Sequence, residues 1–274
     1  MDPRHYQITA LASLLAFGVL FLDFDISVDC IALILASALI TQFACTRLFQ
    51  LPHFDPRSAL ITALSLCLLL RSDSYVVLFG AAVIAITSKF VLRWNGKHIF
   101  NPTNLAVALC IALNWGWISP AQWGSATWLA FLLVCMGGLI VTRAQRADIA
   151  LAFLLLYAGL LFARAMWLGD PLTIPTKQLQ SGTLLLFAFF MISDPKTTPS
   201  EVRGRLLMAC ALAVSAFVLQ FQLYNPKALI YALVLLSPLT IILDYLFPAR
   251  VYQWPPTITR GSSHEHKTSR RRSA

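Results

Sequence analysis

Residues 97–104, with the sequence KHIFNPTN, place polar side chains directly before an apolar stretch. Proline suits the first turn of a helix because it lacks an N–H group that would have no partner there, and Asn101 can cap the free amides. Free amides at a helix start can also bind an anionic or carbonyl-rich ligand. Both interpretations, a plain helix start and a ligand site, stay open for Lys97, Phe100, Asn101, Pro102, Thr103 and Asn104.

A second polar segment, SDPKTTP at residues 193–199, follows a short apolar stretch. Asp before Pro is common turn chemistry, which is the simpler interpretation. Polar side chains and prolines beside a truncated apolar stretch are also typical of a broken helix next to a binding site. The candidate binding residues of this segment are Ser193, Asp194, Pro195, Lys196 and Thr197.

Isolated charges occur near the ends of other apolar stretches. Asp244 lies close to the end of the last one, where it can extend to the membrane interface, yet a carboxylate inside a membrane is a site candidate by default. Lys89 and Arg164 are also near the ends of apolar stretches, and we expect their long side chains to reach the interface.

The composition predicts a membrane protein. Hydrophobic residues make up 58% of the 274 positions, charged residues only 12%, and the mean hydropathy is +0.71. Such a chain cannot cover a water-exposed surface, which excludes a soluble nucleotide-binding enzyme, a secreted disulfide scaffold and a disordered chain. The net charge of +9 is concentrated in the C-terminal tail, so anionic lipid at the membrane surface explains it and no nucleic-acid partner is expected.

Several chemistries have no residues to support them. The sequence contains no Walker loop, G-x-G-x-x-G, H-E-x-x-H or serine nucleophile elbow, so ATP-driven pumping and zinc proteolysis are not expected. The six cysteines form no C-x-x-C pair and suit small core positions. The five histidines, His5, His53, His98, His264 and His266, all fall in predicted loops or tails, so none is placed to clamp a haem.

Hydropathy predicts ten membrane spans with both termini in the cytoplasm. A span needs about 20 apolar residues, fewer where a broken helix is enclosed by protein, as expected for the third, fifth and eighth segments. With the N-terminus inside, inner loops and termini hold 17 of the 21 Lys and Arg residues, as in a bacterial-type inner membrane. The predicted spans are residues 7–22, 29–46, 57–70, 74–93, 102–117, 123–142, 147–167, 181–193, 204–222 and 226–246.

The chain resembles itself at a shift of about 121 to 124 residues. SALITALSLCLLLRSD from Ser58 resembles SGTLLLFAFFMISD from Ser181, and FNPTNLAVALCIAL resembles YNPKALIYALVLLS, which aligns Asn225 with Asn101. An odd number of spans per unit forces opposite orientations, so we expect an inverted repeat with any site near the midplane. The predicted parts are a first five-span repeat over 1–122, a second over 123–248 and a disordered basic cytoplasmic tail over 249–274.

These motifs resemble a known family of membrane proteins: RnfD of the Rnf electron-transport complex and its relative NqrB of the sodium-pumping NADH:quinone oxidoreductase. The resemblance runs from Ser58 to about Arg250, and its most specific part is F-F-M-x-x-D-P-x-T-x-P at residues 189–199. It implies two inverted five-span halves, an architecture similar to urea channels, and flavin (FMN or riboflavin) in transmembrane electron transfer. The flavin-binding candidates are then the residues of both polar segments, Asn225 and Asp244.

One loop departs from the family pattern. The family esterifies FMN to a threonine before span eight, in a motif like D-G-x-S-G-A-T, whereas this chain has Asp170-Pro171-Leu172-Thr173-Ile174-Pro175-Thr176. Pro175 stiffens the backbone before the acceptor and Ile174 adds bulk where a modifying enzyme must approach. We therefore expect noncovalent flavin rather than covalent flavin on Thr176, and a chain without flavin stays an alternative.

Two classes of function follow from these observations. The first is a redox subunit rather than a complete enzyme, lacking its own nicotinamide or iron–sulfur domain and requiring other redox proteins or flavoproteins as partners. The second is a channel or transporter for a small solute or ion, because fold resemblance alone does not decide function. A third, an assembly partner for a separate flavoprotein, has little support in the short outer loops.

Overall fold

The computed structural model describes residues 2–22, 24–119 and 127–252. Regular structure in these ranges is almost entirely helical, with two short antiparallel strand pairs, in agreement with the predicted all-α class. The predicted repeat boundary between residues 122 and 123, and the predicted tail beyond residue 252, lie outside the described residues.

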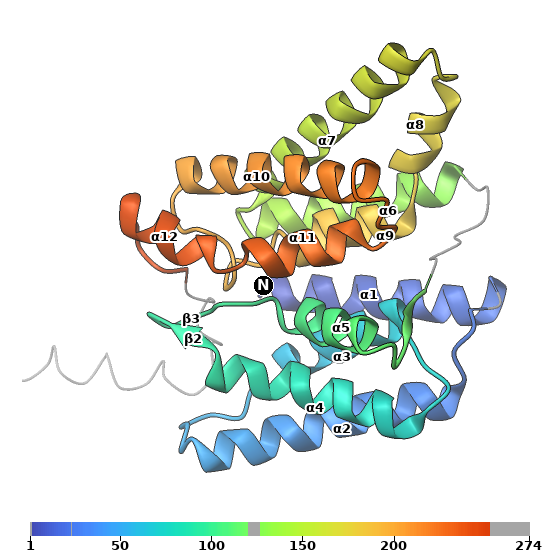
Figure 1. The fold of residues 1–274 in the computed structure, drawn as a ribbon. Coiled ribbons are helices and arrows are strands. Elements are labelled where there is room, and N and C mark those ends of the chain that lie inside the picture. Colours follow the sequence, from blue (N-terminus) through green and yellow to red (C-terminus); the bar gives the residue numbers. More distant parts are fainter. Residues whose placement is uncertain (1, 23, 120–126, 253–274) are drawn as a thin grey trace, which may run out of the picture.

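The residues before the gap form the lower half of the molecule in Figure 1. α2 packs against α3 and α4, α1 against α3, and α4 against α5. Two short strands, β2 and β3, form a hairpin that precedes α5, and β1 pairs with β4 after α5. The elements are α1 (Pro3–Phe21), α2 (Val28–Leu48), α3 (Pro56–Leu69), β1 (Leu70–Arg71), α4 (Tyr75–Val91), β2 (Arg93–Trp94), β3 (Lys97–His98), α5 (Pro102–Ala112) and β4 (Trp117–Ile118).

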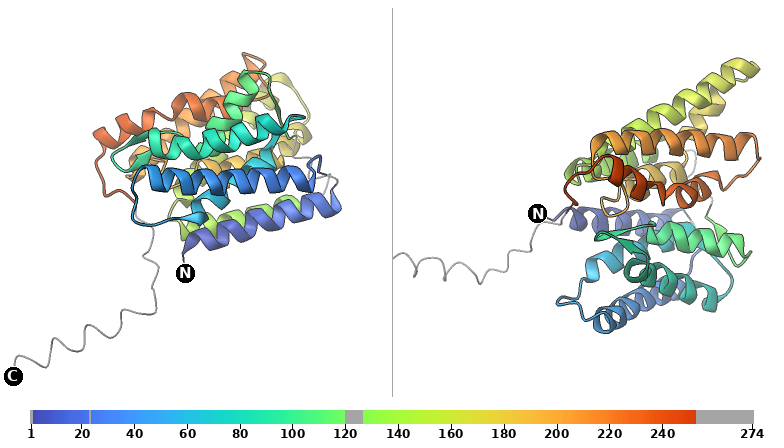
Figure 2. Two further views of the ribbon diagram at one scale, coloured as in Figure 1. Left: turned by 90° about the horizontal axis from the view of Figure 1, so that it is seen from below. Right: turned by 60° about the vertical axis from the view of Figure 1, so that its left-hand side comes forward.

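The residues after the gap form the upper half (Figure 1). α7 packs against α10, α10 against α11, and α6 against α9 and η1, while the halves meet through α5 with α11 and α1 with α6. Figure 2 shows the same two layers from further directions. The elements are α6 (Thr127–Arg143), α7 (Ala147–Leu168), α8 (Thr173–Leu179), α9 (Gly182–Leu186), the π-helix η1 (Phe187–Met191), α10 (Val202–Phe221), α11 (Ala228–Leu236) and α12 (Leu239–Leu246).

Local sequence chemistry positions the start of α5. The side chain of Asn101 accepts a hydrogen bond from the N–H of Asn104 at 3.1 Å, so the predicted helix cap is confirmed. Before it, Asn95 and Gly96 both have positive φ, 46° and 77°, as the two-residue turn of a hairpin requires. The hairpin returns the chain from the end of α4 to the start of α5.

The number of membrane-crossing helices differs from the ten predicted spans. Among the described residues, α2, α7 and α10 are long and apolar enough to cross a membrane, and α11 with α12 makes a fourth candidate. The predicted span 226–246 is bent by 48° between α11 and α12, where Pro238 supplies no N–H to continue the helix. The other apolar helices are shorter: α3, α4, α5, residues 133–143 of α6, and α9 with η1.

The short helices form the core of the molecule. Most of α3 and all of η1 are buried, including Leu66, Leu68 and Phe187. Short helices are possible here because the longer helices pack around them and cover their apolar side chains. The covering helices are α1, α2, α4, α7 and α10. Asn101 and Thr103 at the start of α5 are buried as well, and Ser58 in the first turn of α3 is half-buried.

Candidate functional site

A cavity of about 220 Å³ lies where α3 and α5 begin. Asn101, Pro102 and Thr103 line it from one half of the chain, and Asp194 and Lys196 line it from the other. The two polar segments that the sequence singled out separately therefore meet at one place. Apolar side chains complete the wall: Leu51, Ile61, Phe90, Phe190 and Met191.

Hydrogen bonds fix the two segments to each other. The side-chain amide of Asn101 donates to the carbonyl of Met191 at 3.3 Å, and the N–H of His98 donates to the carbonyl of Lys196 at 2.9 Å. Asn104 lies deeper, 1% exposed, and its amide donates to the carbonyl of Ile230 in α11 at 3.0 Å. Asn101 and Asn104 thus hold α5 against the second half of the chain.

Asp194 organises the loop that follows η1. Its carboxylate accepts from the N–H of Lys196 at 2.9 Å, and its carbonyl accepts from the N–H groups of Thr197 and Thr198. Burial raises the pKa of Asp194, which favours the neutral acid. The neighbouring Ser193 and Pro195 are buried but do not line the cavity, and Thr197 bonds back to the Asp194 carbonyl. Within this segment, Asp194 and Lys196 are the residues in contact with the cavity.

Lys97 and Asp244 form an ion pair outside the cavity. The ammonium of Lys97 lies 2.5 Å from the Asp244 carboxylate, and it also donates to the Thr198 carbonyl and to the Ser200 hydroxyl. The other carboxylate oxygen of Asp244 accepts from the N–H of Ser200 at 2.7 Å. The pair connects α12 and the β2–β3 hairpin to the loop after Asp194. Phe100 is half-buried and is likewise not among the residues that line the cavity.

We expect Asp244→Asn to destabilise the protein by about 3 kcal/mol, because it leaves the buried Lys97 without the negative charge that compensates it. Thermal unfolding in detergent measures the loss. The double variant Lys97→Met, Asp244→Leu removes both charges and is expected to recover most of the stability. An Asp244→Asn variant as stable as wild type would show that the pair contributes nothing to the fold.

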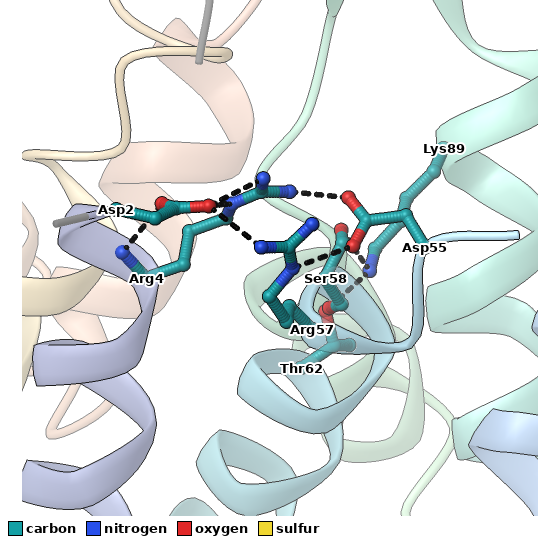
Figure 3. Close-up of polar contacts among 7 residues, drawn as sticks. All are labelled: Asp2, Arg4, Asp55, Arg57, Ser58, Thr62 and Lys89. Atoms are coloured by element: carbon teal, nitrogen blue, oxygen red, sulfur yellow. Dashed lines mark hydrogen bonds and ion pairs between the residues drawn. The ribbon is translucent and has the colours of Figure 1, made fainter. Parts of the chain in front are cut away.

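Two charged side chains that line the cavity, Arg4 and Asp55, belong to a cluster of four with Asp2 and Arg57 (Figure 3), and no motif in the sequence pointed to it. Arg4 pairs with Asp2 at 2.6 Å and also contacts Asp55, while Arg57 lies 3.1 Å from Asp2 and 3.4 Å from Asp55. Although burial opposes ionisation, the hydrogen bonds from Arg4 lower the pKa of Asp2. This cluster joins the start of α1 to the start of α3 and balances its own charges.

Lys89 was expected to reach the membrane interface, and this expectation is wrong. Its side chain points inward, is 5% exposed and lines the cavity. Its ammonium donates to the carbonyl of Ser58 at 2.7 Å and to the Ser58 hydroxyl at 3.1 Å (Figure 3). The start of α3 provides buried oxygen acceptors there, so the lysine does not need to leave the protein to be solvated.

Asn225 and Thr176 lie away from this cavity. The side chain of Asn225 accepts from the N–H of Lys227 at 2.9 Å, beside a second cavity of about 430 Å³ that is lined by Pro226, Lys227 and Ser181. Asn225 thus forms a local turn two residues before the N-cap of α11, whereas Asn101 is itself the N-cap of α5. Thr176 is exposed on α8, which the sequence did not predict, and its hydroxyl donates to the carbonyl of Leu172 at 2.7 Å.

For Thr176 we expect no covalent flavin. Thr176 lies within α8 and directly follows Pro175, which stiffens the backbone at this point. A modifying enzyme would therefore have to unwind the helix to reach the hydroxyl. Ultraviolet imaging of the denatured band, with Thr176→Ala beside it, measures this directly. A fluorescent wild-type band that becomes dark in the variant would overturn the expectation.

Comparisons with known proteins bear on the second half of the chain. A model of the NQR2, RnfD, RnfE family matches residues 111–253. Relatives from Salmonella paratyphi B, Salmonella newport and Salmonella heidelberg, each named as the D subunit of an ion-translocating oxidoreductase complex, are 33% identical to this chain over 141 residues. Each match covers 50% of this chain and 37% of the relative, so this chain spans well under two thirds of those proteins.

The family match includes Asp194 and Lys196 of the cavity and begins after the end of the 97–104 segment. That segment reaches the same cavity through the folded structure, with the Asn101 amide bonded to Met191 inside the matched region. Because the matched residues make up just over half of its length, the chain belongs to the NQR2, RnfD, RnfE family.

Proposed function

We propose that this chain is a membrane-embedded electron-transfer subunit that holds a noncovalent flavin in the cavity between α3, α5 and the Asp194 loop, and exchanges electrons with a partner redox protein. The observation that carries the proposal is the convergence of Asn101, Thr103 and Asp194 on one cavity. Membership of the family and the names of its relatives, subunits of ion-translocating oxidoreductase complexes, supply the class of function.

The residues present suit a flavin ring. The ring needs apolar contacts on its faces and hydrogen-bond partners along one edge, and the cavity offers both, with Phe90 and Phe190 beside Ser58, Thr62 and Thr103. Gln42 is 6% exposed and its side-chain oxygen has no hydrogen-bond partner among the described residues, although it faces this cavity. A buried acceptor of this kind is expected to receive a bond from a ligand.

When bound, the flavin would supply one- and two-electron transfer. The chain's own residues would hold the ring: Thr103 at the start of α5, and Asp194 with Lys196 in the facing loop. Asn101 acts indirectly, because its hydrogen bonds to Asn104 and Met191 keep these two walls at a fixed separation. The enclosing helices would exclude water from the ring.

The proposed architecture is ten membrane-embedded segments in two inverted five-segment repeats, 1–122 and 123–248, in a bacterial-type inner membrane with cytoplasmic termini. Equivalent packing supports the repeat: α2 packs against α4 as α7 packs against α10, and α4 against α5 as α10 against α11. The two cavities also correspond, since each lies at the start of a helix that follows an Asn-Pro pair, Asn101-Pro102 or Asn225-Pro226.

The cavities also support a second candidate function, a channel for a small solute. They lie at helix starts in opposite halves of the chain and have no lining residue in common. Leu68, Leu69, Leu186 and Phe190 pack together beside the first cavity, on its inner side. Solute transport would require this apolar packing to open, which an electron carrier does not need.

The deciding measurement is the visible absorbance spectrum of the protein purified in mild detergent from a host that makes flavins. Electron transfer predicts a flavin spectrum that is bleached by dithionite and released as riboflavin or FMN on denaturation. Solute flux in liposomes, from protein that carries no flavin and takes up none, would replace the proposal with the channel.

A further inference from the structure

Lys89 is the one cavity lysine whose ammonium is held in the described structure by serine oxygens alone. No carboxylate forms an ion pair with it among the described residues, and its partners are the Ser58 carbonyl and hydroxyl. An ionised group buried to this extent is costly unless an opposite charge or a set of hydrogen bonds compensates it. A ligand that becomes negative would supply the missing charge.

Neither of the two carboxyl groups that line the cavity, Asp55 and Asp194, forms an ion pair with Lys89 among the described residues. Asp55 is already bonded to Arg4 and Arg57, which both also contact Asp2. The second carboxyl, Asp194, accepts instead from the N–H of Lys196 in its own loop. Burial also lowers the pKa of His98 to about 3, so that histidine is uncharged. The remaining cations that line the cavity, Arg93 and Lys196, add to the positive potential.

Two helix starts reinforce this potential. α3 begins at Pro56 and α5 at Pro102, and both first turns line the cavity with their positive dipole ends. The unpartnered oxygen of Gln42 faces the same space and can orient a ligand N–H. Lys89, Ser58 and the first turns of α3 and α5 thus form one positively polarised subsite around the buried Lys89 side chain.

We propose that this Lys89 subsite stabilises the negative charge that the flavin ring gains when the partner redox protein reduces it. The protein thereby binds the reduced cofactor more tightly than the oxidised one, which raises the midpoint potential of the flavin at this site. The inference rests on the proposed flavin function. Two electrons with one proton add one negative charge to the ring, shared by its N1 and C2 carbonyl, and that edge would face Lys89. Positive charge near this edge is a recognised means of tuning flavin electronics.

The test is a comparison of riboflavin binding and midpoint potential in wild type, Lys89→Gln and Lys89→Arg, with the full-length protein in detergent. Lys89→Gln is expected to weaken binding of the reduced form about tenfold more than binding of the oxidised form, which lowers the two-electron midpoint potential by about 30 mV. Lys89→Arg keeps the charge and is expected to stay close to wild type. Lys177→Gln, an exposed lysine on α8, is the matched control and should change nothing.

The outcomes separate this inference from the proposed function. Equal weakening of riboflavin binding in both oxidation states by Lys89→Gln would show a purely structural lysine and overturn the inference, as would an unchanged midpoint potential. Neither result contradicts the proposed flavin function, because wild-type protein still binds riboflavin. Wild-type protein that takes up no riboflavin overturns the proposed function itself. If Lys89→Gln does not give a single symmetric peak on size exclusion, Lys89→Met, an apolar side chain of similar length, is read by the same criteria.

Discussion

Replacing Asp194 with alanine is expected to weaken riboflavin binding by at least tenfold, about 1.4 kcal/mol. The variant loses the side-chain oxygen that accepts from the N–H of Lys196. The loop that places residues 194 and 196 at the cavity therefore loses its fixed shape. Asp194→Asn keeps an oxygen acceptor for this bond and a neutral side chain, and it is expected to bind within about threefold of wild type. Isothermal titration or flavin fluorescence quenching measures both variants. Equal binding by wild type and Asp194→Ala would remove this loop from the site.

The same residue predicts a pH dependence of stability. The folded-state pKa of Asp194 is raised by burial above its ordinary value of 3.8, so folding favours the protonated carboxyl. The stability that protonation contributes is complete below about pH 3.8 and is lost as the pH rises through the folded pKa. Asp194→Asn cannot ionise, so the melting temperature of the variant minus that of wild type should increase as the pH is raised from about 4. A difference between the two that stays constant over this range would show that Asp194 is ionised in the folded protein.

Short-range chemistry explains what the sequence could predict. The cap at Asn101, the proline start of α5 and the turn at Asp194 each involve residues within four positions of one another, and all three are present in the structure. The resemblance between residues from Ser58 and from Ser181 corresponds to two helices, α3 and α9 with η1, that occupy similar buried positions. Patterns of this kind depend on backbone geometry, which neighbouring residues determine.

Contacts between distant segments were beyond sequence reasoning. Lys89 bonds to Ser58, 31 positions away, and Arg57 bonds to Asp2, 55 positions away. Nothing in the local sequence around Lys89 or Arg57 indicates a partner at such a distance along the chain. A lysine near the end of an apolar stretch looks the same whether its side chain turns outward or inward. The break after α11 is a different case, because Ser237-Pro238 was visible in the sequence and was placed inside one continuous span.

Asn101→Ala is expected to cost about 2–4 kcal/mol of stability and to lower flavin retention. It removes the α5 cap, worth about 1 kcal/mol, and leaves the buried carbonyl of Met191 without its 3.3 Å donor. The carbonyl depends on this amide because the residue four positions on, Pro195, has no N–H to donate. Asn101→Asp keeps the cap acceptor but cannot donate as a carboxylate, so it isolates the Met191 bond.

Asn225→Ala is the matched control, because Asn225 belongs to the second Asn-Pro pair and its acceptor bond to Lys227 lies beside the second cavity. We expect Asn225→Ala to lower the melting temperature while riboflavin affinity stays unchanged, and both Asn101 variants to lose affinity. The reason is geometric: the Asn101 amide links the two walls of the first cavity, and Asn225 contacts neither wall through any bond in the described structure. Parallel loss of flavin in all three variants would mean that general destabilisation, and not the first cavity, controls retention.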